Sequence, residues 1–174
     1  MDPTDDVRVT LELDEEYRRE LAAGNALAET TFAIRVDGTY LVGGPVGEQS
    51  EPVLLYLTKV LDGLDEVLDG TERWFGCLSL PGGLRVTPTD GAVSLWFGYA
   101  EGFNPDVPEA GLPVSQDACV RALLGAGRDL HDVVRRVETP VLHESRYVNR
   151  FERTLASADR RYGGRAASDD SGRR

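Results

Sequence analysis

The sequence predicts an α+β domain in which a mainly antiparallel sheet of about five or six strands has two or three helices packed on one face. Three observations support this fold class: short runs of alternating apolar residues, Asp-Gly turns between such runs, and long segments with apolar residues at helical spacing. Hairpins join antiparallel neighbours, and an amphipathic helix has to bury its apolar stripe against another layer. A length of 174 residues favours one domain.

Strand patterns occupy the first 42 residues and the middle of the chain. Residues 7–13 alternate strictly between apolar and polar side chains. The β-rich runs 31–36 and 39–42 flank Asp37-Gly38, and both residues of such a turn tolerate positive φ, so this segment predicts a hairpin. A meander is expected from runs 73–80, 84–87 and 92–100, with turns at residues 81–83 and at Asp90-Gly91.

Two amphipathic segments predict the main helices. Residues 50–68 carry apolar residues three and four apart, with Ser50 as the expected cap, and the acidic residues of this segment fall on the other, solvated side. A second long helix is expected from Ser115, and Thr139-Pro140 interrupts it. The predicted last helix covers about residues 141–162.

The remaining segments complete the domain organisation. Residues 1–6 are expected to be a flexible arm, residues 7–162 a single α+β domain, and residues 163–174 a disordered tail. The proline- and glycine-rich segment 101–113 is expected to be a long loop.

Composition constrains the setting of the protein. Acidic residues number 30 against 19 basic ones, the net charge is −11, and Lys59 is the one lysine. This bias resembles proteins of salt-loving archaea with GC-rich genomes, and a GC-rich actinobacterium is the alternative. The acidic start of the chain does not resemble a signal peptide and no apolar run approaches the length of a membrane span, so a cytoplasmic location is expected.

Reactive residues do not form a recognisable catalytic or metal-binding motif. The four possible zinc ligands Cys77, Cys119, His131 and His143 match no familiar spacing. The glycine-rich run at residues 43–47 lacks the lysine of a phosphate loop and precedes two glutamates, so a connecting loop is expected. We therefore predict no catalytic residues, no cofactor and no metal.

An aromatic repeat supplies the first candidate contact surface. Trp74-Phe75-Gly76 and Trp96-Phe97-Gly98 lie on predicted strands of one meander, where adjacent residues face opposite sides. Trp74 and Trp96, with Phe103 in the following loop, could therefore form an exposed platform. The alternative is that another element covers that face and makes it a second core.

Arginines supply the second candidate surface. Residues 116–174 contain 12 basic and 9 acidic side chains, a net of +3, whereas residues 1–115 contain 7 basic and 21 acidic, a net of −14. Arg146, Arg150 and Arg153 form one ridge of the last predicted helix. The ridge could bind an acidic partner or nucleic acid, or it could pair with the acidic part of the same chain. The net charge argues against nucleic acid.

These observations favour a non-enzymatic protein-interaction or accessory domain that binds an unknown protein partner or forms a homo-oligomer. A second hypothesis is a small-ligand-binding domain or minor enzyme that uses the 101–113 loop, with a pocket lined by Trp96, Phe103 and Cys77. A third is a nucleic-acid accessory protein that uses the arginine-rich last helix. No membrane association is expected.

Overall fold

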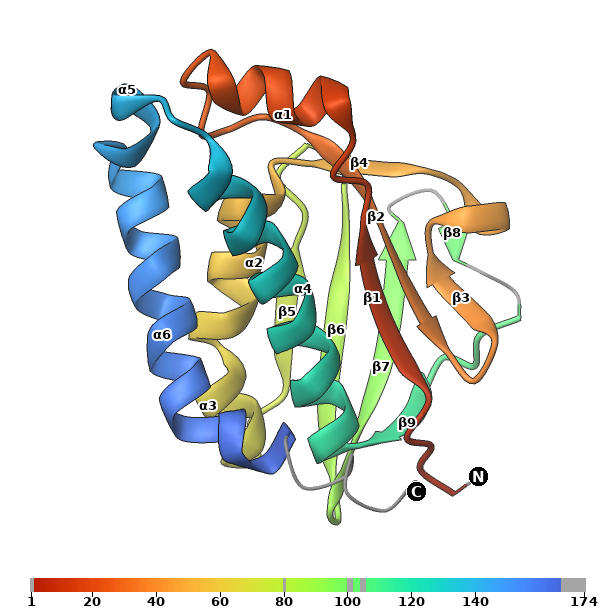
Figure 1. The fold of residues 1–174 in the computed structure, drawn as a ribbon. Helices are drawn as coiled ribbons and strands as arrows, with labels where there is room; N and C mark the ends of the chain where they lie inside the picture. Colours follow the sequence, from red (N-terminus) through yellow and green to blue (C-terminus); the bar gives the residue numbers. More distant parts are fainter. Residues whose placement is uncertain (1, 80, 100–101, 104–105, 167–174) are drawn as a thin grey trace, which may run out of the picture.

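The chain forms two antiparallel sheets beside a layer of helices (Figure 1). The computed structural model describes residues 2–79, 81–99, 102–103 and 106–166. The strands are β1 (Val7–Leu11), β2 (Thr30–Val36), β3 (Thr39–Val42), β4 (Gln49–Glu51), β5 (Arg73–Gly76), β6 (Gly82–Thr89), β7 (Ala92–Tyr99), β8 (Gly102–Phe103) and β9 (Leu112–Ser115). The helices are α1 (Glu15–Ala22), the short 3-10 helix η1 (Gly44–Val46), α2 (Val53–Asp62), α3 (Leu64–Leu68), α4 (Gln116–Arg136), α5 (Pro140–His143) and α6 (Arg146–Ala166). The predicted α+β class with antiparallel sheets is confirmed.

The prediction of one sheet with about five or six strands was wrong. The described strands form a four-stranded sheet of order β1-β2-β3 with β4 also on β2, and a five-stranded sheet of order β5-β6-β7-β8 with β9 also on β7. Helices α2 and α3 separate β4 from β5 along the chain. Because the chain leaves the first sheet before the meander begins, the meander pairs with itself and with later strands.

The N-terminal arm joins the two sheets at one point. The Thr4 N–H donates to the Pro113 carbonyl at 3.1 Å, and the Ser115 N–H donates to the Thr4 carbonyl at 3.0 Å. This parallel bridge lies beside β9, so part of the segment expected to be a flexible arm has a defined pairing partner.

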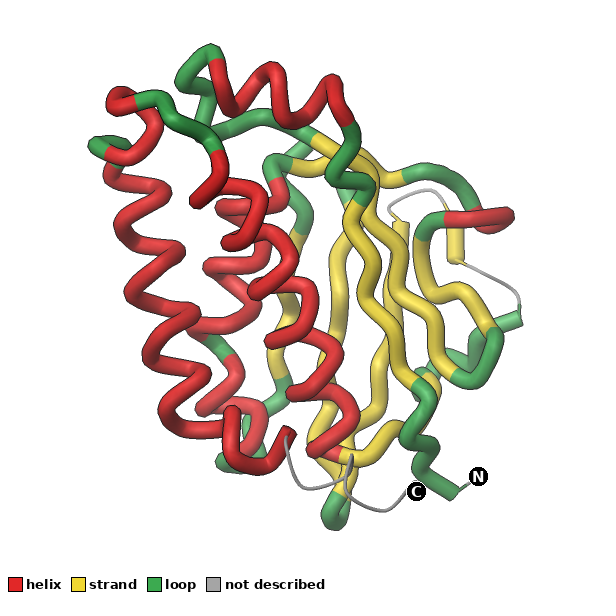
Figure 2. The backbone as a smooth tube through the Cα atoms, in the orientation of Figure 1, coloured by secondary structure: helices red, strands yellow, loops and turns green. Residues whose placement is uncertain are grey.

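Aromatic side chains connect the inner faces of the two sheets. The Phe32 ring centroid lies 5.3 Å from that of Tyr56 on α2 and 6.0 Å from that of Phe97 on β7. Helix α4 packs against β1, α2 and α6, and the three long helices stand side by side along one side of the molecule (Figure 2). Buried residues such as Leu130 and Phe151 lie on the apolar stripes of α4 and α6, as their spacing predicts.

Helix boundaries differ from the predicted ones for local reasons. Ser50 belongs to β4, so the predicted 50–68 helix begins at Val53 and is divided at Gly63. A side chain at position 63 would come within 2.5 Å of the Phe75 ring, so this contact needs a glycine. The segment predicted as one helix over 141–162 forms α5 and then α6, which continues to Ala166. The rest of the predicted tail, residues 167–174, lies outside the described residues.

The segment 101–113 is more ordered than a loop in its described parts. It contains β8 and the first residues of β9, and both strands pair with β7. Strands as short as these do not produce a readable alternation in sequence.

Candidate functional site

The two Trp-Phe-Gly repeats meet across β6. Trp74 pairs with Arg85, and Arg85 pairs with Trp96, so the three side chains form one row on the outer face of the five-stranded sheet. The two indole centroids are 6.1 Å apart, and the Arg85 guanidinium lies 4.8 Å from the Trp96 ring centroid. We call these three residues the Trp-Arg-Trp row.

Glycines in the next row of the sheet make space for the indole rings. Gly76 pairs with Gly83, and Gly83 pairs with Gly98. A Cβ atom at position 98 would lie 1.9 Å from the Trp96 ring, and one at position 83 would lie 2.8 Å from the Trp74 ring. The rings therefore lie over the glycine backbone, which explains why each tryptophan is followed two residues later by glycine.

Of the Trp-Arg-Trp row, Arg85 lines an open groove of about 900 Å³, and the two tryptophans are not part of the groove's lining. Arg85 reaches into this groove and donates to the Glu109 carbonyl, while the Ser94 hydroxyl donates to the Ala110 carbonyl. These bonds fix residues 108–111 as one wall. Trp74 is 52% exposed and Trp96 is partly buried, so the face is accessible at the Trp74 end.

Phe103 belongs to the same sheet, since it pairs with Gly98 through β8. The direction of its side chain, and the neighbouring residues 100–101 and 104–105, lie outside what the structure describes. Cys77 does not share this surface. The Cys77 thiol lies near Tyr56, Lys59 and Glu51. The Trp96 ring instead lies beside Trp74 and Arg85, so the described contacts do not bring Cys77 and Trp96 together.

A buried carboxylate, which the sequence analysis missed, lies beneath the connection between β5 and β6. Glu51 is fully buried and accepts hydrogen bonds from the Leu78 N–H at 2.8 Å and the Ser79 N–H at 3.1 Å. The Gln49 amide also donates to it at 3.2 Å. Glu51 therefore anchors the residues that follow Cys77. In sequence it is one acidic residue among 30, and no signal distinguishes it.

The surroundings of Cys77 keep its thiol protonated. Burial and the nearby Glu51 carboxylate raise the pKa of the Cys77 thiol to about 12, and the Lys59 ammonium opposes this shift. The thiolate is the nucleophilic form of cysteine, so little of the reactive species exists near neutral pH. Burial likewise raises the pKa of Cys119 to about 12.

The two histidines lie apart from both cysteines. His131 Nε2 is 3.4 Å from the Glu152 carboxylate, and His143 Nε2 is 2.5 Å from the Val137 carbonyl oxygen. Within the described part of the chain, no group of three or more His, Cys, Asp or Glu side chains is arranged to hold a metal ion. The His131 contact joins α4 to α6, and the His143 contact joins α5 to the carboxyl end of α4.

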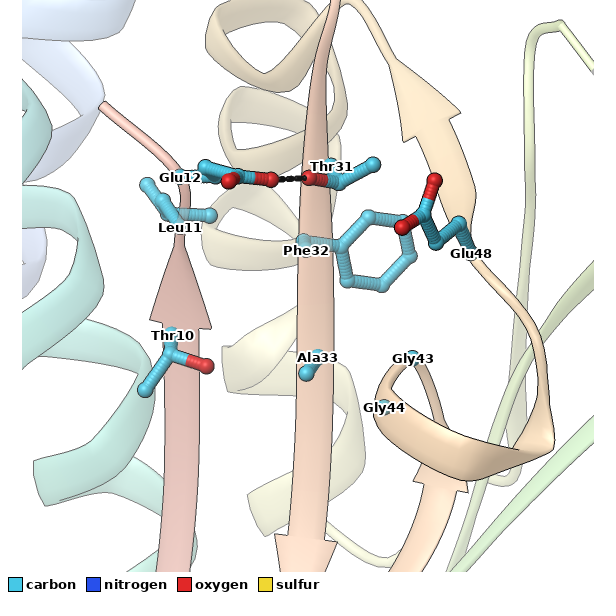
Figure 3. A pocket seen from close by; sticks show the side chains of 9 residues that line it. All are labelled: Thr10, Leu11, Glu12, Thr31, Phe32, Ala33, Gly43, Gly44 and Glu48. Carbon is cyan, nitrogen blue, oxygen red and sulfur yellow. Dashed lines mark hydrogen bonds between the residues drawn. The ribbon is translucent and has the colours of Figure 1, made fainter. Parts of the chain in front are cut away.

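The glycine-rich loop borders a second pocket, of about 360 Å³ (Figure 3). The Gly43 N–H donates to the Gly47 carbonyl at 3.0 Å, and the Gly47 N–H donates to the Gly44 carbonyl at 3.3 Å. The loop thus uses these amides for its own closure. Glu12, which accepts from Thr31, and Glu48 line the pocket and disfavour anions. The interpretation as a connecting loop is supported.

The arginine ridge is divided by its contacts. Arg150 pairs with Asp62 at 2.8 Å, and Arg161 pairs with Asp65, so part of α6 is held against α2 and α3 by ion pairs. Asp62 and Asp65 were expected on a solvated face. Asp62 is exposed and Asp65 is half-buried, and both carboxylates also pair with arginines of α6. Arg146 and Arg153 contact residues of α6 itself.

The comparisons with known proteins add no relative: no protein-family model, no curated protein and no solved structure matches this chain. Among the described helices, none is long and apolar enough to cross a membrane.

Proposed function

We propose that this chain is a non-enzymatic protein-interaction domain and that the outer face of its five-stranded sheet is the contact surface. The observation that supports the proposal is the Trp-Arg-Trp row with its half-exposed Trp74. Tryptophan and arginine are the residues most enriched among binding hot spots, and a large ring left in water gains free energy when a partner buries it.

The row is rigid before any partner arrives. Arg85 is held by stacking on Trp96 and by its bond to the Glu109 carbonyl, and β6 and β7 are paired along their whole length. A contact surface that is already ordered loses less conformational entropy on binding. The row therefore has the organisation expected of an anchor, with the adjacent groove beside it for the rest of the partner segment.

A second candidate function is small-ligand binding in the same groove, because residues 108–111 wall it and its volume of about 900 Å³ suits a small molecule. The groove is open to solvent along the sheet, so we favour a protein partner. We also propose a cytoplasmic protein of a halophilic organism, on the basis of its acidic, lysine-poor composition.

Affinity capture with the tagged full-length chain tests the contact surface. Lysate of the source organism, prepared at high salt, is expected to yield one stoichiometric partner with the wild type. Trp74→Ala should lose it, because the exposed anchor is removed. Val141→Ala is the matched control, since Val141 is 67% exposed on α5, outside the row, and should retain the partner.

The result that contradicts the proposal is equal capture by wild type and Trp74→Ala, or recovery of the chain alone, as a monomer, under every salt condition. Circular dichroism and light scattering must first confirm that each variant is folded and does not aggregate. If the captured partner is a second copy of this chain, light scattering of the wild type will show a dimer that Trp74→Ala dissociates.

A further inference from the structure

Helix α6 carries two sets of arginines that face different surroundings. Arg150 and Arg161 turn toward Asp62 and Asp65. Arg146, Arg153 and Arg160 are exposed and follow one another at intervals of seven residues. With a rise of about 1.5 Å per residue, neighbours in this second set are about 10.5 Å apart along the helix. We call Arg146, Arg153 and Arg160 the solvent arginine row.

No aspartate or glutamate stands three or four residues from any arginine of the solvent arginine row. The positions three and four residues from Arg153 hold Asn149, Arg150, Ala156 and Ser157. Those around Arg160 hold alanine, serine and two glycines, so no carboxylate stands at either spacing. Like charges at these spacings destabilise a helix, and opposite charges stabilise it. Among the described residues, none of the three arginines forms an ion pair, although Glu144 and Glu152 line the same surface as Arg146 and Arg153.

The described contacts of the solvent arginine row are with neutral groups, so they do not neutralise its positive charge. The Arg153 Nε–H donates to the Asn149 carbonyl at 3.2 Å, and the Arg146 guanidinium lies 4.9 Å from the Tyr147 ring centroid. Both contacts hold the side chains in place, and neither brings a carboxylate. Ordered guanidinium groups at fixed spacing are suited to carboxylate recognition.

A trough beside the row gives a partner room to approach. It has a volume of about 630 Å³ and runs over Asn149 and Ala156, the small residues that flank Arg146 and Arg153. Glu144 and Glu152 also border it, and Glu152 faces His131 at 3.4 Å. Small side chains between charged ones let the backbone of another helix come close.

We infer that the solvent arginine row binds an acidic helix of a protein partner, whose carboxylates repeat at seven-residue intervals and whose small or apolar face lies over Asn149 and Ala156. The complementarity of charge and of spacing carries this inference. Nucleic acid also offers anionic groups, but residues 1–115 have a net charge of −14 and would repel a long phosphate backbone. The inference does not rest on the Trp-Arg-Trp row.

A designed peptide probe tests the inference. The probe is a synthetic helical peptide with glutamate at every seventh position, and its control is the same peptide with glutamine there. Fluorescence anisotropy with the full-length chain should show binding of the glutamate peptide that weakens with salt, and much weaker binding of the glutamine peptide. Arg146→Gln, Arg153→Gln and Arg160→Gln combined should weaken binding about tenfold, because three surface ion pairs are lost.

Charge-matched and shape-matched variants separate recognition from general attraction. Arg8→Gln, Arg18→Gln and Arg19→Gln combined change the net charge by the same amount at exposed positions of β1 and α1, and should leave the affinity within about twofold. Ala156→Trp keeps every charge but fills the trough, and should weaken binding as well. Trp74→Ala should bind the probe like the wild type, which keeps this test separate from that of the sheet surface.

Three results would overturn the inference. The first is equal weakening by the two triple variants, which would indicate only long-range attraction. The second is tighter binding of a short DNA duplex than of the glutamate peptide at the same salt. The third is a wild-type dimer that the row variant dissociates, which would assign the row to a second copy of this chain.

Discussion

The inner and outer faces of the five-stranded sheet use the same two Trp-Phe-Gly repeats for different purposes. On the inner face, Phe75 and Phe97 are each 1% exposed and pack in the closed core. On the outer face, Trp74 is 52% exposed, and the Arg85 guanidinium stacks on the Trp96 ring. Because successive residues of a strand alternate between faces, one three-residue motif supplies both a core residue and a surface residue. Aromatic content alone therefore does not locate the core of this protein.

The largest expected effect lies on the inner face. Phe97→Ala should lower the free energy of unfolding by about 3–5 kcal/mol, because it leaves a cavity where the ring contacts Phe32. Trp74→Ala should change it by less than about 1 kcal/mol, since the ring is half exposed. Urea unfolding followed by circular dichroism measures both. Similar losses for the two variants would show that the two faces do not differ as described.

The three paired glycines Gly76, Gly83 and Gly98 lie beneath the indole rings on the outer face, and substitutions there should have an intermediate effect. Gly98→Val should cost about 1–3 kcal/mol, because the new side chain occupies the position of the Trp96 ring and forces it out. Tryptophan fluorescence should shift to longer wavelength as that ring enters water. The control is Gly125→Ala on α4, where no atom lies within 4 Å of the new Cβ, and an unchanged or slightly higher stability is expected. A Gly98→Val variant as stable as the wild type would contradict this account of the glycines.

The smallest expected effect is on the reactivity of Cys77, which directly follows β5. The folded pKa of about 12 lies above the ordinary value of 9.0. The contribution of the protonated thiol to stability is therefore complete below pH 9.0 and is lost as the pH rises toward about 12. In a Cys119→Ala background, a thiol reagent should react slowly near neutral pH and faster as the pH approaches the folded pKa.

Removal of the neighbouring negative charge sharpens this test. Glu51→Gln should lower the pKa of Cys77 and speed the reaction at a given pH, because the Glu51 carboxylate contributes to the raised value. Glu29→Gln is the control, since this exposed carboxylate contacts the Ser79 hydroxyl instead. An identical rate for Glu51→Gln and its parent would show that burial alone controls the thiol.

Local patterns in the sequence predicted much of the fold. The Asp37-Gly38 hairpin is present with φ values of 46° and 80°, as an Asp-Gly turn between β-rich runs requires. The long amphipathic helices and the β6–β7 hairpin are also present. By contrast, β4 and β8 are too short to show alternation. The need for glycine at position 63, where the helix divides, depends on the Phe75 ring, which is distant in sequence.

The candidate sites were predicted less completely than the fold. Trp74 and Trp96 could be placed on one face because strand alternation is local, but Arg85 joined them only through the register of β6. The arginine ridge was recognised by helical spacing, yet its division required knowledge of which side of α6 meets Asp62 and Asp65. The burial of Glu51 could not be predicted, because a single buried carboxylate produces no periodic pattern in the sequence.

By itself the sequence determined the elements whose information is local: the turns, the amphipathic helices, the alternation that separates Trp from Phe, and the uneven distribution of charge. Tertiary structure alone decided that there are two sheets instead of one and that Arg85 lies between the tryptophans. It also decided that only some arginines of α6 form ion pairs with α2 and α3. The physical reason is that strand register and ion pairing join residues far apart in the chain, so they depend on the packing of whole elements and not on any one segment.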